Sequence, residues 1–252
     1  MLKAVLFDLD DTLLDWRGFQ QEWPSYEQHM LRRLFDHVNR DEALLPDFAA
    51  FENEFRDRTR EGWRNGRGTL IAPHLGMILR ESVEAQGAPS GRFSVEECLR
   101  AYRWGAVPGT VIFPGVGETL QTLLDAGIKT AIVTNAYQPM WVRDVEIEQH
   151  GILHYFPECR ISAADVGLLK PHPTIFEVTL RQLGVKPDEA VFVGDNPIAD
   201  IAGGQGAGMR AVLRVTTPTP PMLSGLIVPD AAINELPELL PILDEWFPGW
   251  RA

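Results

Sequence analysis

The sequence predicts an α/β fold, in which a parallel sheet is interrupted after its first strand by an all-helical segment. Short apolar stretches alternate with amphipathic ones in the second half of the chain. This alternation is typical of parallel strands joined by crossover helices. Roughly ninety residues with helical periodicity separate these stretches from an apolar strand at the N-terminus. The two patterns together indicate a Rossmann-like core that carries a helical insertion.

The insertion follows directly on the first strand, which we expect over residues 3–8. Apolar side chains then recur at helical spacing, at Phe19, Trp23, Tyr26, Met30, Leu34, Phe48, Phe51, Phe55, Leu75, Ile78, Leu79 and Val83. Ser94 and Glu97 form a capping box that opens a further helix. Turn signals stand at Pro46, Gly66, Gly68 and residues 87–91. We therefore expect roughly four helices.

The second half of the chain predicts the remaining strands and helices. Strands are expected over 129–135, near 159–162, over 190–195 and over 210–214. Helices are expected over 118–127, from 136 to about 150, over 172–184 and over the glycine-rich stretch 198–208. We assign residues 1–15 and 110–252 to the α/β core and residues 16–109 to the helical domain.

Composition excludes several functional classes. The chain has 252 residues, of which 45% are hydrophobic and 23% charged, as in globular proteins with a buried core. Its net charge of −12 argues against a nucleic-acid partner. Two cysteines, Cys98 and Cys159, give neither zinc spacing nor a disulfide framework. The absence of a membrane-length apolar run or a signal peptide leads us to expect no membrane partner and a cytoplasmic location.

Polar residues gather where three predicted strands end. Because ligands of open parallel sheets bind beyond the carboxyl ends of the strands, these side chains mark one candidate site. Lys170 precedes a predicted helix and could reach the same edge. The strand-end residues are Asp8, Asp10, Thr134, Asn135, Asp195 and Asn196, with Asp200 one helical turn further on.

The acids at this edge require a counter-charge. Two ionised carboxylates about 4 Å apart repel by ~4 kcal/mol at an effective dielectric constant near 20. Mg²⁺ prefers carboxylate oxygens, so a bound Mg²⁺ with Lys170 would make the edge locally cationic and suited to a phosphate. Thr12, Thr134 and Asn135 could hold phosphate oxygens. An aspartate can attack phosphorus, and a second acid can transfer protons; which of Asp8 and Asp10 attacks stays open.

Four short motifs resemble those of the haloacid dehalogenase-like hydrolase superfamily. They are "DLDDT" at 8–12, "VTN" at 133–135, "KP" at 170–171 and "GDNPIAD" at 194–200. The insertion resembles the C1-type helical cap of this superfamily. Any one motif is weak evidence, but all four occur in order and on the expected elements.

The resemblance implies a role for each matching residue. Asp8 would be the nucleophile, and Asp10 the general acid and base that also binds Mg²⁺ through its backbone carbonyl. Thr134 would bind phosphoryl oxygens, and Lys170 would neutralise the negative charge. Asp195 would bind Mg²⁺ directly. Asp200 and Asn196 would support the metal site, so that the metal set is Asp8, Asp10 and Asp195.

The function expected from these residues is Mg²⁺-dependent hydrolysis of a small phosphomonoester through an aspartyl-phosphate. Haloacid dehalogenation needs no acid at Asp10, and a phosphonatase would need a cap lysine, whereas no lysine lies between Lys3 and Lys129. A sugar phosphomutase stays an alternative. A phospho-receiver module is the non-enzymatic alternative, but it would not need the helical insertion. Oligomeric state is left open.

The helical insertion is expected to act as a lid over the site. We interpret residues 63–69, "WRNGRGT", as a loop between two helices, from which Arg64 or Arg67 could meet the leaving group. The tryptophans of this region fit core positions better than a substrate platform. They are Trp16, Trp23, Trp63 and Trp104.

Overall fold

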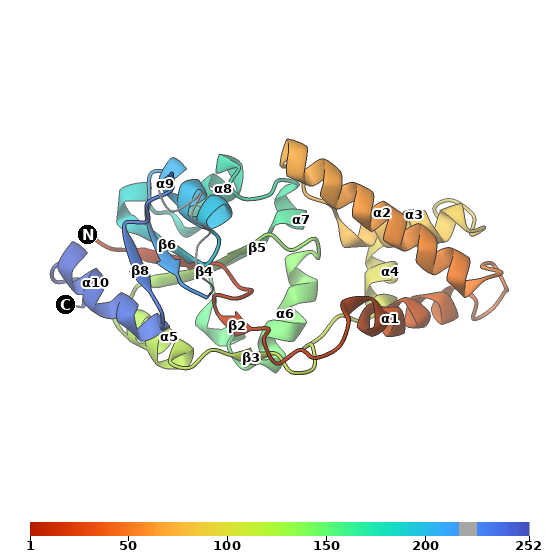
Figure 1. Cartoon of the computed structure of the whole chain (residues 1–252), viewed down its shortest axis with the longest axis horizontal. Helices are drawn as coiled ribbons and strands as arrows, with labels where there is room; N and C mark the ends of the chain where they lie inside the picture. Colours follow the sequence, from red (N-terminus) through yellow and green to blue (C-terminus); the bar gives the residue numbers. More distant parts are fainter. Residues whose placement is uncertain (217–225, 252) are drawn as a thin grey trace.

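The computed structural model describes residues 1–216 and 226–251 and is built on a six-stranded parallel sheet (Figure 1). The strand order is β5-β4-β1-β6-β7-β8. The strands are β1 (Ala4–Phe7), β4 (Lys129–Thr134), β5 (Cys159–Ser162), β6 (Ala190–Gly194), β7 (Arg210–Arg214) and β8 (Ala231–Ile233). A small antiparallel pair, β2 (Leu14–Asp15) and β3 (Val111–Ile112), lies beside it. The predicted fold class is confirmed.

Strand β1 lies at the topological switch point of the sheet. The chain extends from β1 to β4 and β5 on one side, and then to β6, β7 and β8 on the other. Leu6 is accordingly paired with Ala131 of β4 and with Phe192 of β6. Ligands of such sheets bind in the crevice beyond the strand ends at this point. The chain that leaves β1 therefore enters the crevice directly.

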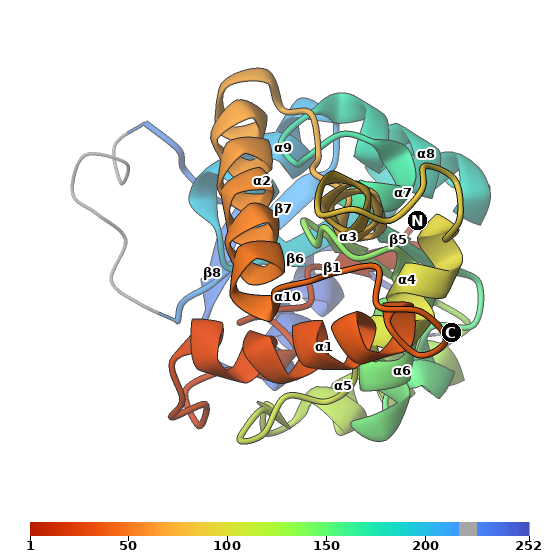
Figure 2. The same ribbon diagram turned by 90° about the vertical axis from the view of Figure 1, so that its right-hand side faces the viewer.

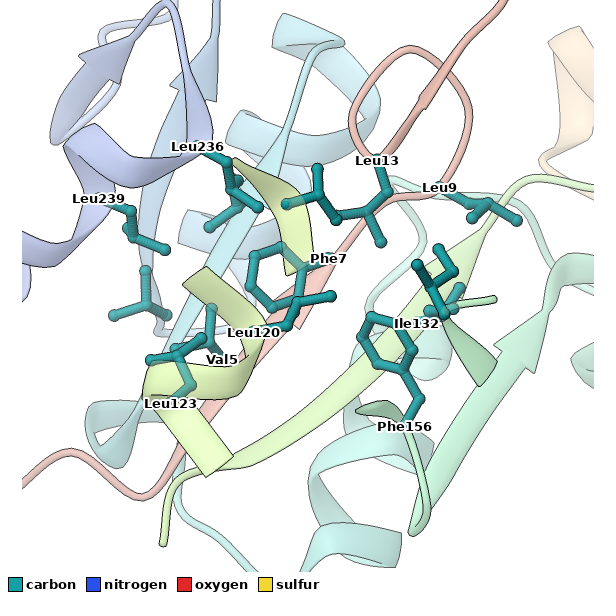
Figure 3. Close-up of a cluster of buried hydrophobic side chains, with 14 of the residues drawn as sticks. Val5, Phe7, Leu9, Leu13, Leu120, Leu123, Ile132, Phe156, Leu236 and Leu239 are labelled. Carbon is teal, nitrogen blue, oxygen red and sulfur yellow. The ribbon is translucent and has the colours of Figure 1, made fainter. Parts of the chain in front are cut away.

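Alternate residues of β1 contribute to two separate cores, because successive side chains of a strand point to opposite faces. Val5 and Phe7 pack in one cluster with Leu120, Leu239 and their neighbours (Figure 3). Ala4 and Leu6 pack in the other, against Phe176. Helices cover both faces, so the strand is apolar along its whole length.

The helices around the sheet follow the expected crossover pattern. They are α5 (Val116–Asp125), α6 (Met140–Gln149), α7 (Ala163–Val166), α8 (Pro173–Leu183), α9 (Gly203–Gly206) and α10 (Leu239–Trp246). Short 3₁₀ turns occupy Leu153–Tyr155, Pro187–Glu189 and Leu236–Glu238. A π-helical segment, Pro197–Ala202, precedes α9, where the sequence predicted one continuous helix. The C-terminal β8 and α10 were not predicted.

Four helices of the insertion lie together beyond the carboxyl edge of the sheet (Figures 1 and 2). They are α1 (Trp23–Val38), α2 (Phe48–Thr69), α3 (Leu75–Ala85) and α4 (Val95–Tyr102). Their buried side chains form a cluster of their own, which also takes in Tyr137 and Val142 from the core side. The expected number of helices is confirmed, while the domain boundaries stay a prediction.

Two local predictions about these helices need correction. Residues 63–69 form the C-terminal part of α2 and are not a loop. Gly66 serves close packing there, since an added Cβ would lie 2.8 Å from the carbonyl oxygen of Ile71. Ser94 caps α4 by accepting from the Glu97 backbone amide, but the Glu97 carboxylate pairs with His37 at 3.0 Å, so the capping box is half formed.

Within the described ranges 1–216 and 226–251, none of the helices has the length and apolar character required to cross a bilayer.

We expect Gly203→Ala to destabilise the fold and Gly206→Ala to leave it intact. A Cβ at Gly203 would lie 2.7 Å from the Phe176 ring and 3.1 Å from the Pro171 backbone, next to the Lys170 loop. A Cβ at Gly206, in the same helix, would meet no atom within 4 Å. Overpacking at Gly203 should lower the free energy of unfolding by ~1–3 kcal/mol. Alanine at the open helical position Gly206 should raise it by up to ~1 kcal/mol. Urea denaturation measures both; equal stabilities would contradict the packing argument.

Candidate active site

A cavity of about 400 Å³ opens at the carboxyl edge of the sheet, between the strand ends and the helical insertion. Asp8 and Asp10 line it after β1, Thr134 at the end of β4, and Asp195 after β6. Its described lining comprises Asp8, Asp10, Trp16, Trp23, Trp63, Trp104, Thr134, Asn135, Ala136, Tyr137, Gln138, Arg143, Lys170, Asp195, Asn196, Ala199 and Asp200. The structure thus brings nearly all of the predicted site residues to one place.

Lys170 lies at the centre of the buried charges. Its Nζ is 2.7 Å from Oδ1 of Asp8, 2.7 Å from Oδ1 of Asp200, and 2.7 Å from the carbonyl oxygen of Val133. All three ionic side chains are buried. Three oxygens thus surround the ammonium group, and one cation is shared by two carboxylates. This arrangement fixes the orientation of Asp8.

The pKa values at this cluster reflect burial and like charges. Burial, with smaller contributions from Asp200 and Asp10, raises the pKa of Asp8 to about 8, although Lys170 opposes the shift. Burial would lower the pKa of Lys170, but Asp200 and Asp8 outweigh it and raise the pKa. With Asp8 and Asp200 both ionised, the cluster would carry more negative charge than Lys170 alone can neutralise.

Asp8, Asp195 and Asp200 form a set of carboxylates suited to a cation. One oxygen from each lies within 4.8 Å of the others. Burial, followed by Asp200 and Asp11, raises the pKa of Asp195 to about 6. A cation among these oxygens would lower the repulsion between the three carboxylates. The set of carboxylate oxygens therefore fits a hard divalent ion. The carboxylate of Asp10 is not in this set, and the predicted role of its backbone carbonyl stays a prediction.

Asp10 faces the cavity and is held by two donors. Its Oδ1 accepts from Arg143 Nη2 at 2.7 Å and from Trp16 Nε1 at 2.9 Å. The side chain of Asp10 is 35% exposed, whereas that of Arg143 is 4% exposed. Because both donors use Oδ1, the second oxygen, Oδ2, is left for a ligand in the cavity.

Arg143 is a site residue that the sequence analysis missed. Besides Asp10, its Nε lies 3.0 Å from Oε2 of Glu146, which also accepts from Trp104 Nε1 at 2.9 Å. Burial would lower the pKa of Arg143, but Asp10 and Glu146 raise it, so the guanidinium stays charged. The sequence held a signal, since Arg143 and Glu146 share the apolar face of α6 with Met140.

Three predicted phosphate ligands occupy different positions. Thr134 is buried at the end of β4 and lines the cavity. Asn135 lines it too, but its side chain accepts from the Lys170 amide at 2.7 Å and donates to the Lys170 carbonyl at 3.2 Å. Thr12 lies outside the described lining and donates to Oδ2 of Asp8 at 3.3 Å. Asn135 and Thr12 thus position Lys170 and Asp8.

Asn196 caps the π-helical segment. Its side-chain oxygen accepts from the backbone amides of Ile198 and Ala199, both at 3.0 Å. Its backbone amide donates to Oδ2 of Asp200 at 2.9 Å. The contacts of Asn196 and Asp200 therefore shape the loop that carries Asp195.

The insertion contributes aromatic residues to the cavity, and its two candidate arginines lie elsewhere. Arg64 and Arg67 are exposed on α2 and are absent from the described lining. Trp104 is buried in the core cluster of the insertion and the other three tryptophans pack against it, as predicted, but all four also line the cavity. A contact of Arg64 or Arg67 with a leaving group stays a prediction.

Comparisons with known proteins identify the family of this chain. The family model of the haloacid dehalogenase-like hydrolases matches residues 2–208. Glyceraldehyde 3-phosphate phosphatase of Methanopyrus kandleri is 32% identical over 84% of this chain and 83% of its own. Phosphoserine phosphatase of Thermus thermophilus is 30% identical over 94% and 98%.

Solved structures show the same architecture. The 2-haloacid dehalogenase of Pseudomonas syringae pv. Tomato superposes with a TM-score of 0.64 and 26% identity, covering 98% of this chain and all of the other. A phosphatase of Thermococcus onnurineus superposes with a TM-score of 0.60 and 27% identity, covering 96% and 98%. With the buried Asp8–Lys170–Asp200 cluster at the strand ends, these matches establish that the chain belongs to the haloacid dehalogenase-like hydrolase family.

Proposed function

We propose that the protein hydrolyses a small phosphomonoester through an aspartyl-phosphate on Asp8. The observation that carries this proposal is the pair of acids in one cavity. Asp8 is fixed by Lys170, and Asp10 is held so that Oδ2 is available. Curated relatives at 30% identity or more are named as phosphatases, and this supports the same reaction class.

The residues divide the reaction into two steps. In the first, a carboxylate oxygen of Asp8 forms a bond to phosphorus, the bond to the leaving oxygen breaks, and Asp10 donates a proton to that oxygen. In the second, Asp10 takes a proton from water, whose oxygen attacks phosphorus. Phosphate leaves, and the Asp8 carboxylate is regenerated. Lys170 offsets the negative charge throughout.

We further propose Mg²⁺ as the cation of the Asp8, Asp195 and Asp200 cluster. When bound, Mg²⁺ supplies positive charge that offsets the carboxylates and the phosphoryl group. The residues themselves orient Asp8 and keep water from its buried side, since Lys170 and Thr12 occupy its oxygens. Residues 16–109 would act as the lid.

Dehalogenation is the competing reaction on this fold. The solved relative with a TM-score of 0.64 is described as a 2-haloacid dehalogenase. Asp10 favours phosphate chemistry, because proton transfer to the leaving oxygen needs an acid there and halide departure does not. Product analysis would also separate a hydrolase, which releases free phosphate, from a sugar phosphomutase.

Asp8→Asn should abolish phosphate release. The amide cannot act as the nucleophile, so turnover should fall by on the order of a thousandfold or more. Asp188→Asn is the matched control, since Asp188 is exposed in the turn Pro187–Glu189 and is absent from the described lining. Initial rates with 4-nitrophenyl phosphate, with circular dichroism to verify folding, test both. Normal turnover by Asp8→Asn would exclude the proposed nucleophile.

Asp10→Asn should lower kcat by about 10²–10⁴ while the aspartyl-phosphate still forms. An asparagine keeps the contacts of Oδ1 but cannot donate or take the proton. Rapid-quench measurement with an activated aryl phosphate should therefore show a burst of product followed by slow turnover. Unchanged kcat would show that Asp10 does not transfer the proton. Rapid release of chloride from 2-chloropropionate by both the wild-type protein and Asp10→Asn would favour dehalogenation.

Mg²⁺ should raise the melting temperature of the wild-type chain, because a ligand of the native state stabilises it. At tenfold excess over Kd the gain is about 1.4 kcal/mol, or roughly 2–4 °C in a protein of this size. Asp195→Asn should lose most of this shift. Asp188→Asn, which alters an exposed acid in the turn Pro187–Glu189, should retain it. An equal shift in all three chains would show that the cation binds elsewhere.

A further inference from the structure

The part of the cavity wall away from the carboxylate cluster is aromatic. Trp16, Trp23, Trp63, Trp104 and Tyr137 all line it. The ring centroids of Trp16 and Trp23 are 6.2 Å apart, and those of Trp23 and Trp104 are 5.8 Å apart. Trp63 and Tyr137 form a second pair at 5.8 Å. The rings thus form two groups, within which neighbouring rings are inclined to each other by 50–61°.

Three of these five rings donate a hydrogen bond from their polar atom to a side chain of the protein. Trp16 Nε1 donates to Asp10, and Trp104 Nε1 donates to Glu146, both at 2.9 Å. The Tyr137 hydroxyl donates to Glu27 at 3.1 Å. These three rings therefore offer a ligand their carbon surface, with no free hydrogen-bond donor. Such carbon surfaces favour an apolar, aromatic partner, whose ring can pack edge-to-face or offset against the indoles.

The cationic side chains of the described lining are already paired with carboxylates. In the described lining they are Lys170 and Arg143. Lys170 has three oxygens around it, and Arg143 lies between Asp10 and Glu146. A second anionic group on the substrate would have to displace one of these buried pairs, which would leave a buried carboxylate without its partner.

We propose that the natural substrate is a phosphomonoester whose leaving group is uncharged and carries an aromatic ring. This inference rests on the proposed function and narrows its substrate class. The phosphoryl group lies against Asp8 and Lys170, while the ring of the leaving group packs on the indoles. Selection follows from buried aromatic contact on one side and from the absence of an uncommitted cation in the described lining on the other.

The closing experiment compares phosphate esters of primary alcohols that differ only in the group attached to the carbon that bears the leaving oxygen. Benzyl phosphate should exceed ethyl phosphate in kcat/KM by about tenfold or more. Carboxymethyl phosphate, which adds an anion, should fall below ethyl phosphate. Cyclohexylmethyl phosphate has an apolar ring that is not aromatic, so its kcat/KM should lie between those of benzyl phosphate and ethyl phosphate. Preference for carboxymethyl phosphate or for phosphocholine over benzyl phosphate would overturn the proposal.

Variants connect this preference to the indoles. Trp63→Ala should lower the benzyl-to-ethyl ratio of kcat/KM by about tenfold, and Trp63→Phe should retain most of it. Trp141→Ala is the matched control, because Trp141 is 41% exposed on α6 and lies outside the described lining. An unchanged ratio in Trp63→Ala and in Trp23→Ala, with folding verified by thermal denaturation, would contradict the aromatic wall.

Binding measurements separate this inference from the proposed function. Benzylphosphonate and ethylphosphonate cannot be hydrolysed, and calorimetry gives their Kd values for the wild-type chain with Mg²⁺. If benzylphosphonate binds about tenfold more tightly than ethylphosphonate, the proposed substrate class is supported. A failure to turn over any ester would then refute only the proposed hydrolysis. Equal Kd values would refute the substrate class whether or not hydrolysis is observed.

Discussion

The interaction on which the site depends is the contact of Lys170 with three oxygens. Its Nζ joins Asp8 after β1, the Val133 carbonyl in β4, and Asp200 in the π-helical segment after β6. One buried ammonium thus connects three segments that are far apart in the sequence. Removing one partner of a buried ion pair costs ~3–5 kcal/mol, because the other charge is left unpaired. The geometry of the cavity and the stability of this sheet edge therefore depend on the same atom.

A second ion-pair network extends from Asp10 toward the insertion. Arg143 joins Asp10 to Glu146, and Glu146 accepts from Trp104 at the end of the helical segment. The acid that we assign to proton transfer is thus connected through α6 to the aromatic wall. The group that we propose for proton transfer and the indole that we propose for substrate contact thus share a set of polar contacts, so a change at Glu146 or Trp104 is expected to affect Asp10.

The sequence was informative where chemistry and periodicity coincide. The strand-end acids and Lys170 could be placed because parallel strands bring their carboxyl ends to one edge. Gly66 marks no turn, because it permits the approach of Ile71 and Leu169 to a continuous helix. The position of Arg143 on the apolar face of α6 is visible in the sequence, but its partner Asp10 lies on a distant segment, and only that partner identifies it as a site residue. Tertiary packing therefore decides both positions.

The connection between α2 and α3 has a consequence for engineering. Its backbone pairs with the chain just before Lys170, through Leu169 N to Leu70 O at 2.8 Å and Ala72 N to Gly167 O at 3.0 Å. The insertion is therefore attached by backbone hydrogen bonds here, in addition to its two covalent junctions. A chimaera that exchanges residues 16–109 for those of a relative would have to reproduce this short pairing. Otherwise the graft would alter the support of Lys170, even with every core residue retained.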